Sequence, residues 1–141
     1  MRTAAVVGTT LILVSLGACG DDAAPRPAAT PCAPPAETST VGLIPRDLEL
    51  GRFGTVTSAV RRGRRIEAQV VTTTSIIELY PPLARQVIDA GYTIVSSENE
   101  GTDAEIFFAR GRVAAVYLMR QGPCGELVTI TLDYVRELKR A

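Results

Sequence analysis

The reactive side chains of this 141-residue chain exclude several kinds of chemistry. There is no histidine, so the chain lacks the commonest general base near neutral pH and the commonest metal ligand. Lys139 is the only lysine, and neither a glycine-rich phosphate loop nor a zinc-spaced cysteine set is present. We therefore expect a non-enzymatic protein with no cofactor and no metal. The formal net charge is zero, so no nucleic acid is expected as a partner.

A group of arginines surrounds Gly63 on a predicted tight turn; its members are Arg61, Arg62, Arg64 and Arg65. On a membrane protein such a turn can contact anionic lipid headgroups or a phosphate-rich polymer, because each arginine near an anionic surface contributes about 1 kcal/mol. The alternative is a solvated hairpin tip whose charges discourage pairing with other strand edges.

A second charged group holds the carboxylates Glu98, Glu100, Asp103 and Glu105. Carboxylate oxygens are ligands for hard cations such as calcium. Their spacing does not match the twelve-residue calcium loop, so we interpret the group as a solvated loop and predict no metal site.

The first 18 residues have the organisation of an export signal. Arg2 supplies a positive charge, and residues 4–15 form an apolar run that is too short to span a bilayer. The Leu-Gly-Ala-Cys sequence at residues 16–19 resembles the lipobox of bacterial lipoproteins. This resemblance implies that residues 1–18 are removed and that lipid on Cys19, such as diacylglycerol and palmitate, holds the chain on the outer face of a membrane. An ordinary cleaved signal and an uncleaved anchor are the alternatives.

Residues 19–42 are rich in proline and alanine, which predicts an extended tether after the lipidated cysteine. Once lipid occupies Cys19, two cysteines remain: Cys32 within the tether and Cys124 in a Gly-Pro-Cys-Gly turn. Because an extracytoplasmic compartment is oxidising, we expect an intramolecular disulfide between them. A free thiol or an intermolecular bridge would be the alternative.

Residues 43–141 are predicted to form one α+β domain. Alternating apolar residues predict a hairpin around Gly63, with Val56, Ser58 and Val60 on one face. Ser75 then begins either a helix that is kinked by two prolines or a short turn followed by the main helix, and the helical segment ends near residue 91. The remaining runs predict strands over 92–97, 104–110, 113–120 and 127–134, and a short helix over 135–141. The order ββαββββ corresponds to a two-layer sandwich of an antiparallel sheet and one main helix.

Three large side chains, Phe107, Tyr117 and Met119, are expected on the sheet face away from the helix. An exposed apolar face of this kind can mark a partner surface. The alternative is that the first hairpin or the segment 43–50 covers it. The Gly91-Tyr92 transition, the run 104–108 and Cys124-Gly125 are similar to small uncharacterised actinobacterial lipoproteins, a resemblance that implies no activity.

Together these patterns predict a lipid-anchored envelope lipoprotein on the extracytoplasmic side of the cell membrane. We expect it to act as a non-enzymatic binding or accessory module. Its partners would be the membrane, through lipid on Cys19, and an envelope protein or anionic headgroups. The alternative hypothesis is a carrier that holds a small apolar ligand between helix and sheet.

The lipid anchor gives a direct prediction. Cys19→Ala should abolish membrane retention, because the variant has no thiol at the site where lipid is attached. Fractionation and intact mass of the protein from its host measure this. A variant that still fractionates with membranes, and whose mass matches that of a wild-type chain without lipid, would contradict the prediction.

Overall fold

The computed structural model describes residues 32–33, 36–38 and 42–136, and it confirms the predicted α+β fold. The predicted export signal, Cys19, most of the predicted tether and residues 137–141 lie outside the described residues. The elements are, in chain order, the 3-10 helix η1 (Leu50–Phe53), strands β1 (Thr55–Arg62) and β2 (Arg65–Thr72), helix α1 (Ile76–Asp89), and strands β3 (Thr93–Asn99), β4 (Asp103–Arg110), β5 (Val113–Gln121) and β6 (Val128–Arg136).

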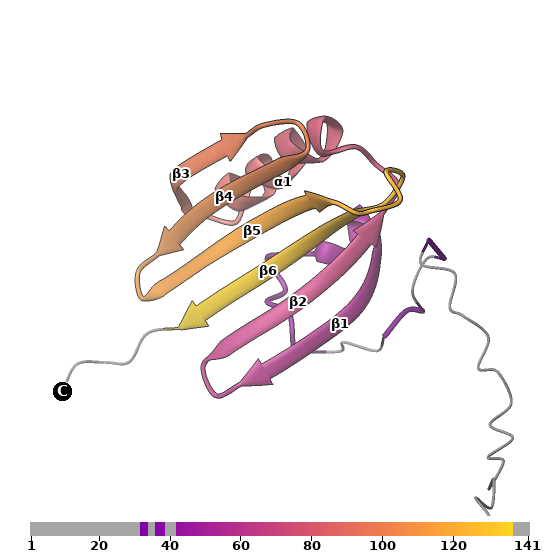
Figure 1. Ribbon diagram of the computed structural model, residues 1–141. Coiled ribbons are helices and arrows are strands. Elements are labelled where there is room, and N and C mark those ends of the chain that lie inside the picture. Colours follow the sequence, from indigo (N-terminus) through magenta and orange to yellow (C-terminus); the bar gives the residue numbers. More distant parts are fainter. Residues whose placement is uncertain (1–31, 34–35, 39–41, 137–141) are drawn as a thin grey trace, which may run out of the picture.

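The six strands form one antiparallel sheet in the order β1-β2-β6-β5-β4-β3 (Figure 1). Short connections within the hairpins dictate antiparallel neighbours, as expected. The last strand, β6, lies between β2 and β5 and pairs with β2 from Arg65↔Val135 to Thr72↔Val128. The first hairpin, β1–β2, is therefore joined to the rest of the sheet by β6, the last strand of the described chain.

A β-bulge in β1 changes which side chains face the core. The register with β2 shifts between Val56 and Ser58, which leaves Thr57 without a partner. Val56 faces inward, and beyond the bulge Ala59 packs against the core while Val60 is 45% exposed. The prediction that Val56, Ser58 and Val60 share one face is thus wrong, because alternation in the sequence contains no sign of the extra residue.

Helix α1 begins and ends as its sequence predicts. Ser75 accepts from the backbone N–H of Glu78, whose side chain accepts from the Ser75 backbone, so the capping box is complete. After Asp89 the chain reverses at Gly91, whose φ of +79° suits glycine, and the Tyr92 N–H donates to the Val87 carbonyl. Both prolines lie inside this one helix. Over the ranges that the structure describes, no helix is long and apolar enough to cross a membrane.

Two segments cover the inner face of the sheet, and Figure 1 shows both on the same side of it. Helix α1 contacts β3, β4 and β5, whereas η1 contacts β1 and β2. The entry segment, residues 42–54, contains η1, and its Leu48, Leu50 and Phe53 are buried in the same cluster as Leu83 and Val87 from the helix. The entry segment is thus part of the core, and the space between α1 and the sheet is filled by side chains.

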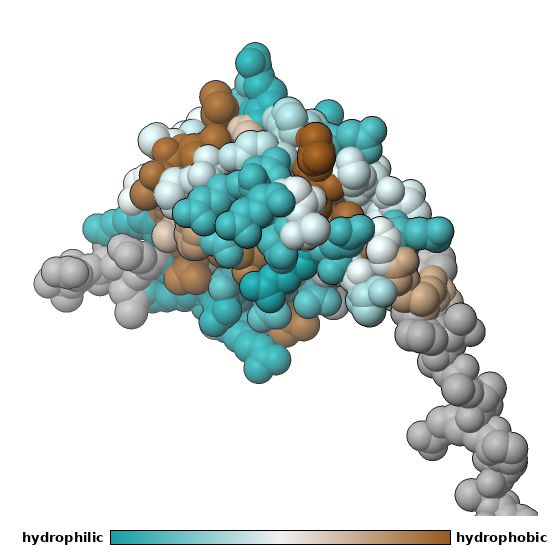
Figure 2. Space-filling model, turned by 45° about the horizontal axis from the view of Figure 1, so that its top comes forward, coloured by the Kyte–Doolittle hydropathy of each residue, from teal (hydrophilic) through white to brown (hydrophobic). Residues whose placement is uncertain are grey.

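The opposite face of the sheet carries Phe107, as predicted, but not Tyr117 or Met119. Tyr117 is the cross-strand partner of Ile106, so it faces inward, and both Tyr117 and Met119 are fully buried. Val116, the partner of Phe107, takes their place on the outer face. In the sequence, β5 has apolar residues at both alternating sets of positions, so alternation alone does not show which face of the strand points inward. On the side that Figure 2 presents, apolar groups are separated by hydrophilic residues.

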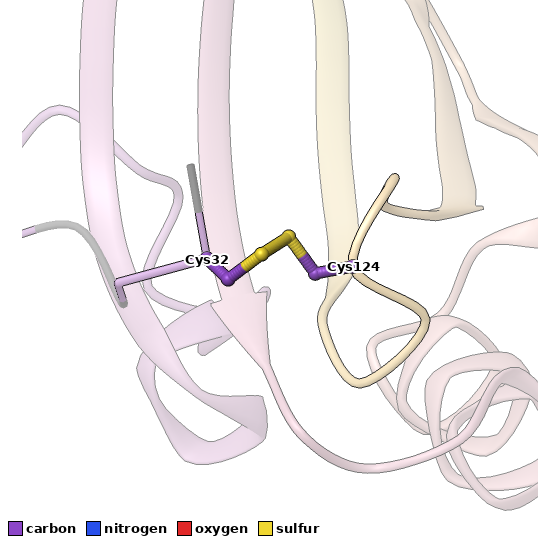
Figure 3. Close-up of a disulfide and its surroundings, with 2 residues drawn as sticks. All are labelled: Cys32 and Cys124. Atoms are coloured by element: carbon purple, nitrogen blue, oxygen red, sulfur yellow. A yellow bond between two sulfur atoms is a disulfide. The ribbon is translucent and has the colours of Figure 1, made fainter. Parts of the chain in front are cut away.

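The expected disulfide between Cys32 and Cys124 is present, with Cα atoms 5.7 Å apart (Figure 3). It fastens the start of the described chain to the β5–β6 connection. Thr38, a few residues further on, donates from its backbone N–H to the Val56 carbonyl and from its hydroxyl to the Thr57 carbonyl. Thr38 is therefore held at the edge strand β1, next to the bulge.

A buried phenol links the helix to the sheet. Tyr117 donates to the Gln86 side-chain carbonyl at 3.0 Å, and burial raises the pKa of Tyr117 well above its ordinary value. The folded state therefore favours the neutral phenol, and the unfolded state loses this proton at lower pH. The resulting stabilisation is complete below about pH 10, the ordinary tyrosine value, and is lost as the pH rises above it.

We predict that the free energy of unfolding falls above pH 10, by up to about 1.4 kcal/mol per pH unit for each such phenol. Tyr117→Phe should lower stability at neutral pH by about 1–3 kcal/mol, because Gln86 loses its donor, and should flatten the alkaline fall. Urea unfolding between pH 8 and 11.5 measures both effects. Equal alkaline slopes for the wild type and the variant would contradict this account.

Candidate anion-binding cleft

A cleft of about 570 Å³ lies at one end of the sheet. The β1–β2 turn, the end of β4 and the end of β6 meet the segment 42–47 there. The charged side chains in its lining are Arg46, Arg61, Arg64, Arg110 and Arg136, with Asp47 as the one carboxylate among the described lining residues. Five arginines that face one carboxylate make the cleft strongly cationic.

Three of these arginines reach the cleft because of how the first hairpin and the last strand are built. Arg61 is the partner of the buried Ile66, so the bulge in β1 turns it to the inner side. Arg64 follows Gly63 in the turn, where a φ of +59° requires glycine. Arg136 ends β6, two residues after the inward-facing Tyr134, and its backbone N–H donates to the Arg64 carbonyl at 3.1 Å.

The four arginines predicted as one group divide between the two faces of the sheet. Arg61 and Arg64 line the cleft. Arg65 instead forms a two-pronged ion pair with Asp133 on the outer face, at 2.6 and 2.9 Å. Arg62 is the cross-strand partner of Arg65 and so shares that face. The turn therefore contributes two arginines to the site instead of four.

Arg110 is neutralised by a network that fastens the entry segment to β4. Its guanidinium lies 2.7 Å from the Asp47 carboxylate and 4.1 Å above the Tyr92 ring centre, and it also donates to the Ala90 carbonyl at the end of α1. The Tyr92 hydroxyl donates to Asp47 at 3.3 Å. These contacts fix the position of the segment 42–47 and thereby the wall of the cleft.

The pKa values in this network follow from the same contacts. Burial, together with the neighbouring Tyr134 hydroxyl and the Asp47 carboxylate, raises the pKa of Tyr92, so its phenol keeps the proton that it donates. Desolvation lowers the pKa of Arg110, but the hydrogen bond to Asp47 and the nearby Tyr92 raise it by more, so that the net shift is upward. Arg110 therefore stays charged beside Asp47, 2.7 Å from its carboxylate.

The other four cleft arginines differ from Arg110 in their ion pairing; they are Arg46, Arg61, Arg64 and Arg136. None of them has a carboxylate oxygen within 4.0 Å among the residues that the structure describes. Apolar side chains, including those of Ile44 and Ile66, and the ring of Tyr134 form the rest of the lining. Guanidinium groups match phosphate and carboxylate geometry, so the arrangement suits an anionic group attached to a partly apolar one.

The acidic group lies at the other end of the sheet and does not assemble into a metal site. Glu98 and Glu105 are cross-strand partners, and the Asp103 carboxylate lies 3.6 Å from Arg120. Over residues 32–33, 36–38 and 42–136, no three potential metal ligands come together. The Asn99 side chain closes the β3–β4 turn by accepting from the Gly101 N–H at 3.0 Å.

Sequence reasoning did not include Arg46, Arg110 or Arg136 in the site. Arg46 belongs to the entry segment, whose path depends on the tertiary contact between Asp47 and Arg110. Arg136 was assigned to a terminal helix, but β6 continues through it, since Val135 pairs with Arg65 and Arg136 pairs with Val113. Extending the alternation of Leu132 and Tyr134 by one step would have placed Arg136 on the inner side.

No family model matches the chain, and neither the curated proteins nor the solved structures contain a similar one.

Proposed function

We propose that the protein is a lipid-anchored binding module of the extracytoplasmic side, which holds an anionic, phosphate-type group in its arginine cleft. The observation that supports this most directly is the set of four cleft arginines without a carboxylate partner among the described residues. Like charges gathered in one concave site repel one another, and an anion that forms charge-assisted hydrogen bonds with them would relieve that repulsion.

Binding fits the cleft better than catalysis does. Among the described lining residues, only Asp47 and Tyr134 belong to the side-chain types that serve as general acids or bases. Asp47 is already held by Arg110 and by the Tyr92 hydroxyl. The part of the lining that the structure describes contains no serine, threonine, cysteine or lysine that could act as a nucleophile. The cleft can therefore recognise a ligand through its guanidinium groups.

The proposed location depends on two features of the sequence and one of the structure. Residues 1–18 have the organisation of an export signal, and Cys19 is the proposed lipid attachment site. The Cys32–Cys124 disulfide supports an oxidising compartment, because such bonds are rare in the cytosol of most organisms. Lipid on Cys19 would then hold the domain at the outer face of the cell membrane.

The alternative hypothesis, a carrier for a small apolar ligand, has no supporting observation. Side chains that face one another between α1 and the sheet, such as Leu83, Val87 and Ile106, have no exposed surface. A ligand in this layer would have to displace packed side chains.

The proposal predicts selective loss of anion binding when cleft arginines are removed. We expect Arg61→Gln with Arg136→Gln to weaken binding of inorganic pyrophosphate at least about tenfold, because each charge-assisted hydrogen bond contributes about 1.5–3 kcal/mol. Isothermal titration calorimetry at low ionic strength, on the mature chain carrying Cys19→Ser to prevent lipidation, measures this effect.

The matched control removes the same charge elsewhere. Arg85→Gln with Arg120→Gln deletes two arginines that lie outside the cleft and are paired with Asp89 and Asp103. This variant should bind pyrophosphate within about twofold of the wild type, since neither arginine lines the cleft. It should also stay folded, because exposed ion pairs contribute little to stability. Equal losses in the two double variants, with both still folded by circular dichroism, would mean that diffuse charge and not the cleft attracts the anion.

A further inference from the structure

The charges of the described domain are separated along the strands. The basic end holds the cleft and the two turns beside it, with Arg46, Arg61, Arg62, Arg64, Arg65, Arg110, Arg112 and Arg136. The opposite, acidic end holds the β3–β4 and β5–β6 connections, with Glu98, Glu100, Asp103 and Glu126 and with Arg120, which is paired with Asp103. These two connections lie together, because the Gln121 N–H donates to the Thr102 carbonyl at 3.0 Å.

The proposed tether joins the domain at the acidic end. Cys124 lies in the β5–β6 connection, and the disulfide brings Cys32 to it (Figure 3). Figure 1 shows this connection and the β1–β2 turn at opposite ends of the sheet. An eight-residue strand such as β2 is about 26 Å long, which is the approximate distance between the two ends.

The length of chain between Cys19 and Cys32 permits either end to approach the membrane. These 13 residues span at most about 43–47 Å when fully extended, which exceeds the length of the domain along its strands. The domain can therefore turn over, so that its basic end meets the membrane. A tether shorter than about 26 Å would forbid this orientation.

Charge complementarity selects between the two orientations on an anionic membrane. Each arginine near such a surface increases partitioning by about fivefold, and the basic end presents several at once. The acidic end is repelled by the same surface. The anchor also makes the contact intramolecular, so a weak affinity of the cleft for one headgroup is sufficient.

From these observations we propose that the domain docks with its basic end on the membrane that holds Cys19, and that the anionic group in the cleft is a phospholipid headgroup of that membrane. This inference rests on the proposed function, because it names the source of the phosphate group. A soluble phosphate compound would have the same chemistry but would leave the domain free to point away from the membrane.

Hydrogen–deuterium exchange of the mature, lipidated chain in vesicles tests the proposal. Compared with vesicles of phosphatidylcholine alone, vesicles with 30% phosphatidylglycerol should slow amide exchange in residues 61–66 and 110–113 at least about threefold. Residues 98–103 at the acidic end should exchange equally in both. Equal exchange at the basic end in the two vesicle types, or protection of the acidic end instead, would overturn the proposal.

Shortening the tether provides the decisive variant. Deleting residues 23–30 leaves five residue steps between Cys19 and Cys32, at most about 18 Å, so the basic end should no longer reach the headgroups and its protection should disappear. Replacing the same residues with eight glycines and serines keeps the length and should keep the protection. Protection that survives the deletion would contradict the proposed docking.

Failure of this inference can be told apart from failure of the proposed function. If the unlipidated chain binds pyrophosphate through the cleft while the anchored chain shows no protection on phosphatidylglycerol, the cleft takes a soluble anion and the docking proposal is wrong. If pyrophosphate does not bind at all, the anion site itself is wrong and the docking proposal fails with it.

Discussion

A sheet that buries one face must be covered across its whole width, and this requirement determines most of the structure. Six strands are about 24 Å wide, whereas a helix with its side chains is about 10–12 Å across. Helix α1 accordingly covers mainly β3, β4 and β5. The segment that precedes β1 has to shield the other half, and it does so by burying Leu48, Leu50 and Phe53.

The cleft is a consequence of that covering. To reach the core, the entry segment passes the end of the sheet, where Asp47 is held by Arg110 and by the Tyr92 hydroxyl. This contact places Arg46 opposite the β1–β2 turn. The bulge at Thr57, whose carbonyl accepts a hydrogen bond from Thr38, turns Arg61 inward as well. The same contacts that complete the core therefore also concentrate positive charge at one end.

Features determined by neighbouring residues could be predicted from the sequence, and features determined by tertiary contacts could not. The capping box of Ser75 and Glu78 depends on local spacing, and the order of elements depends on apolar periodicity. The Cys32–Cys124 disulfide followed from counting the cysteines once Cys19 was assigned to lipid. By contrast, the bulge, the inward direction of Tyr117 and the route of the entry segment depend on pairing and packing between segments far apart in the chain. For this reason the sequence pointed to the arginine turn, but did not show which of its arginines face a common cleft.

The central claim is that Arg46, Arg61, Arg64 and Arg136 form one anion site. Nuclear magnetic resonance of the side-chain Nε–H groups of arginine, recorded during a titration with inorganic pyrophosphate, tests it most directly. The account predicts that these four signals shift together with one dissociation constant, while those of Arg85 and Arg120 stay in place. Shifts of similar size at all six arginines, or separate dissociation constants within the four, would contradict it.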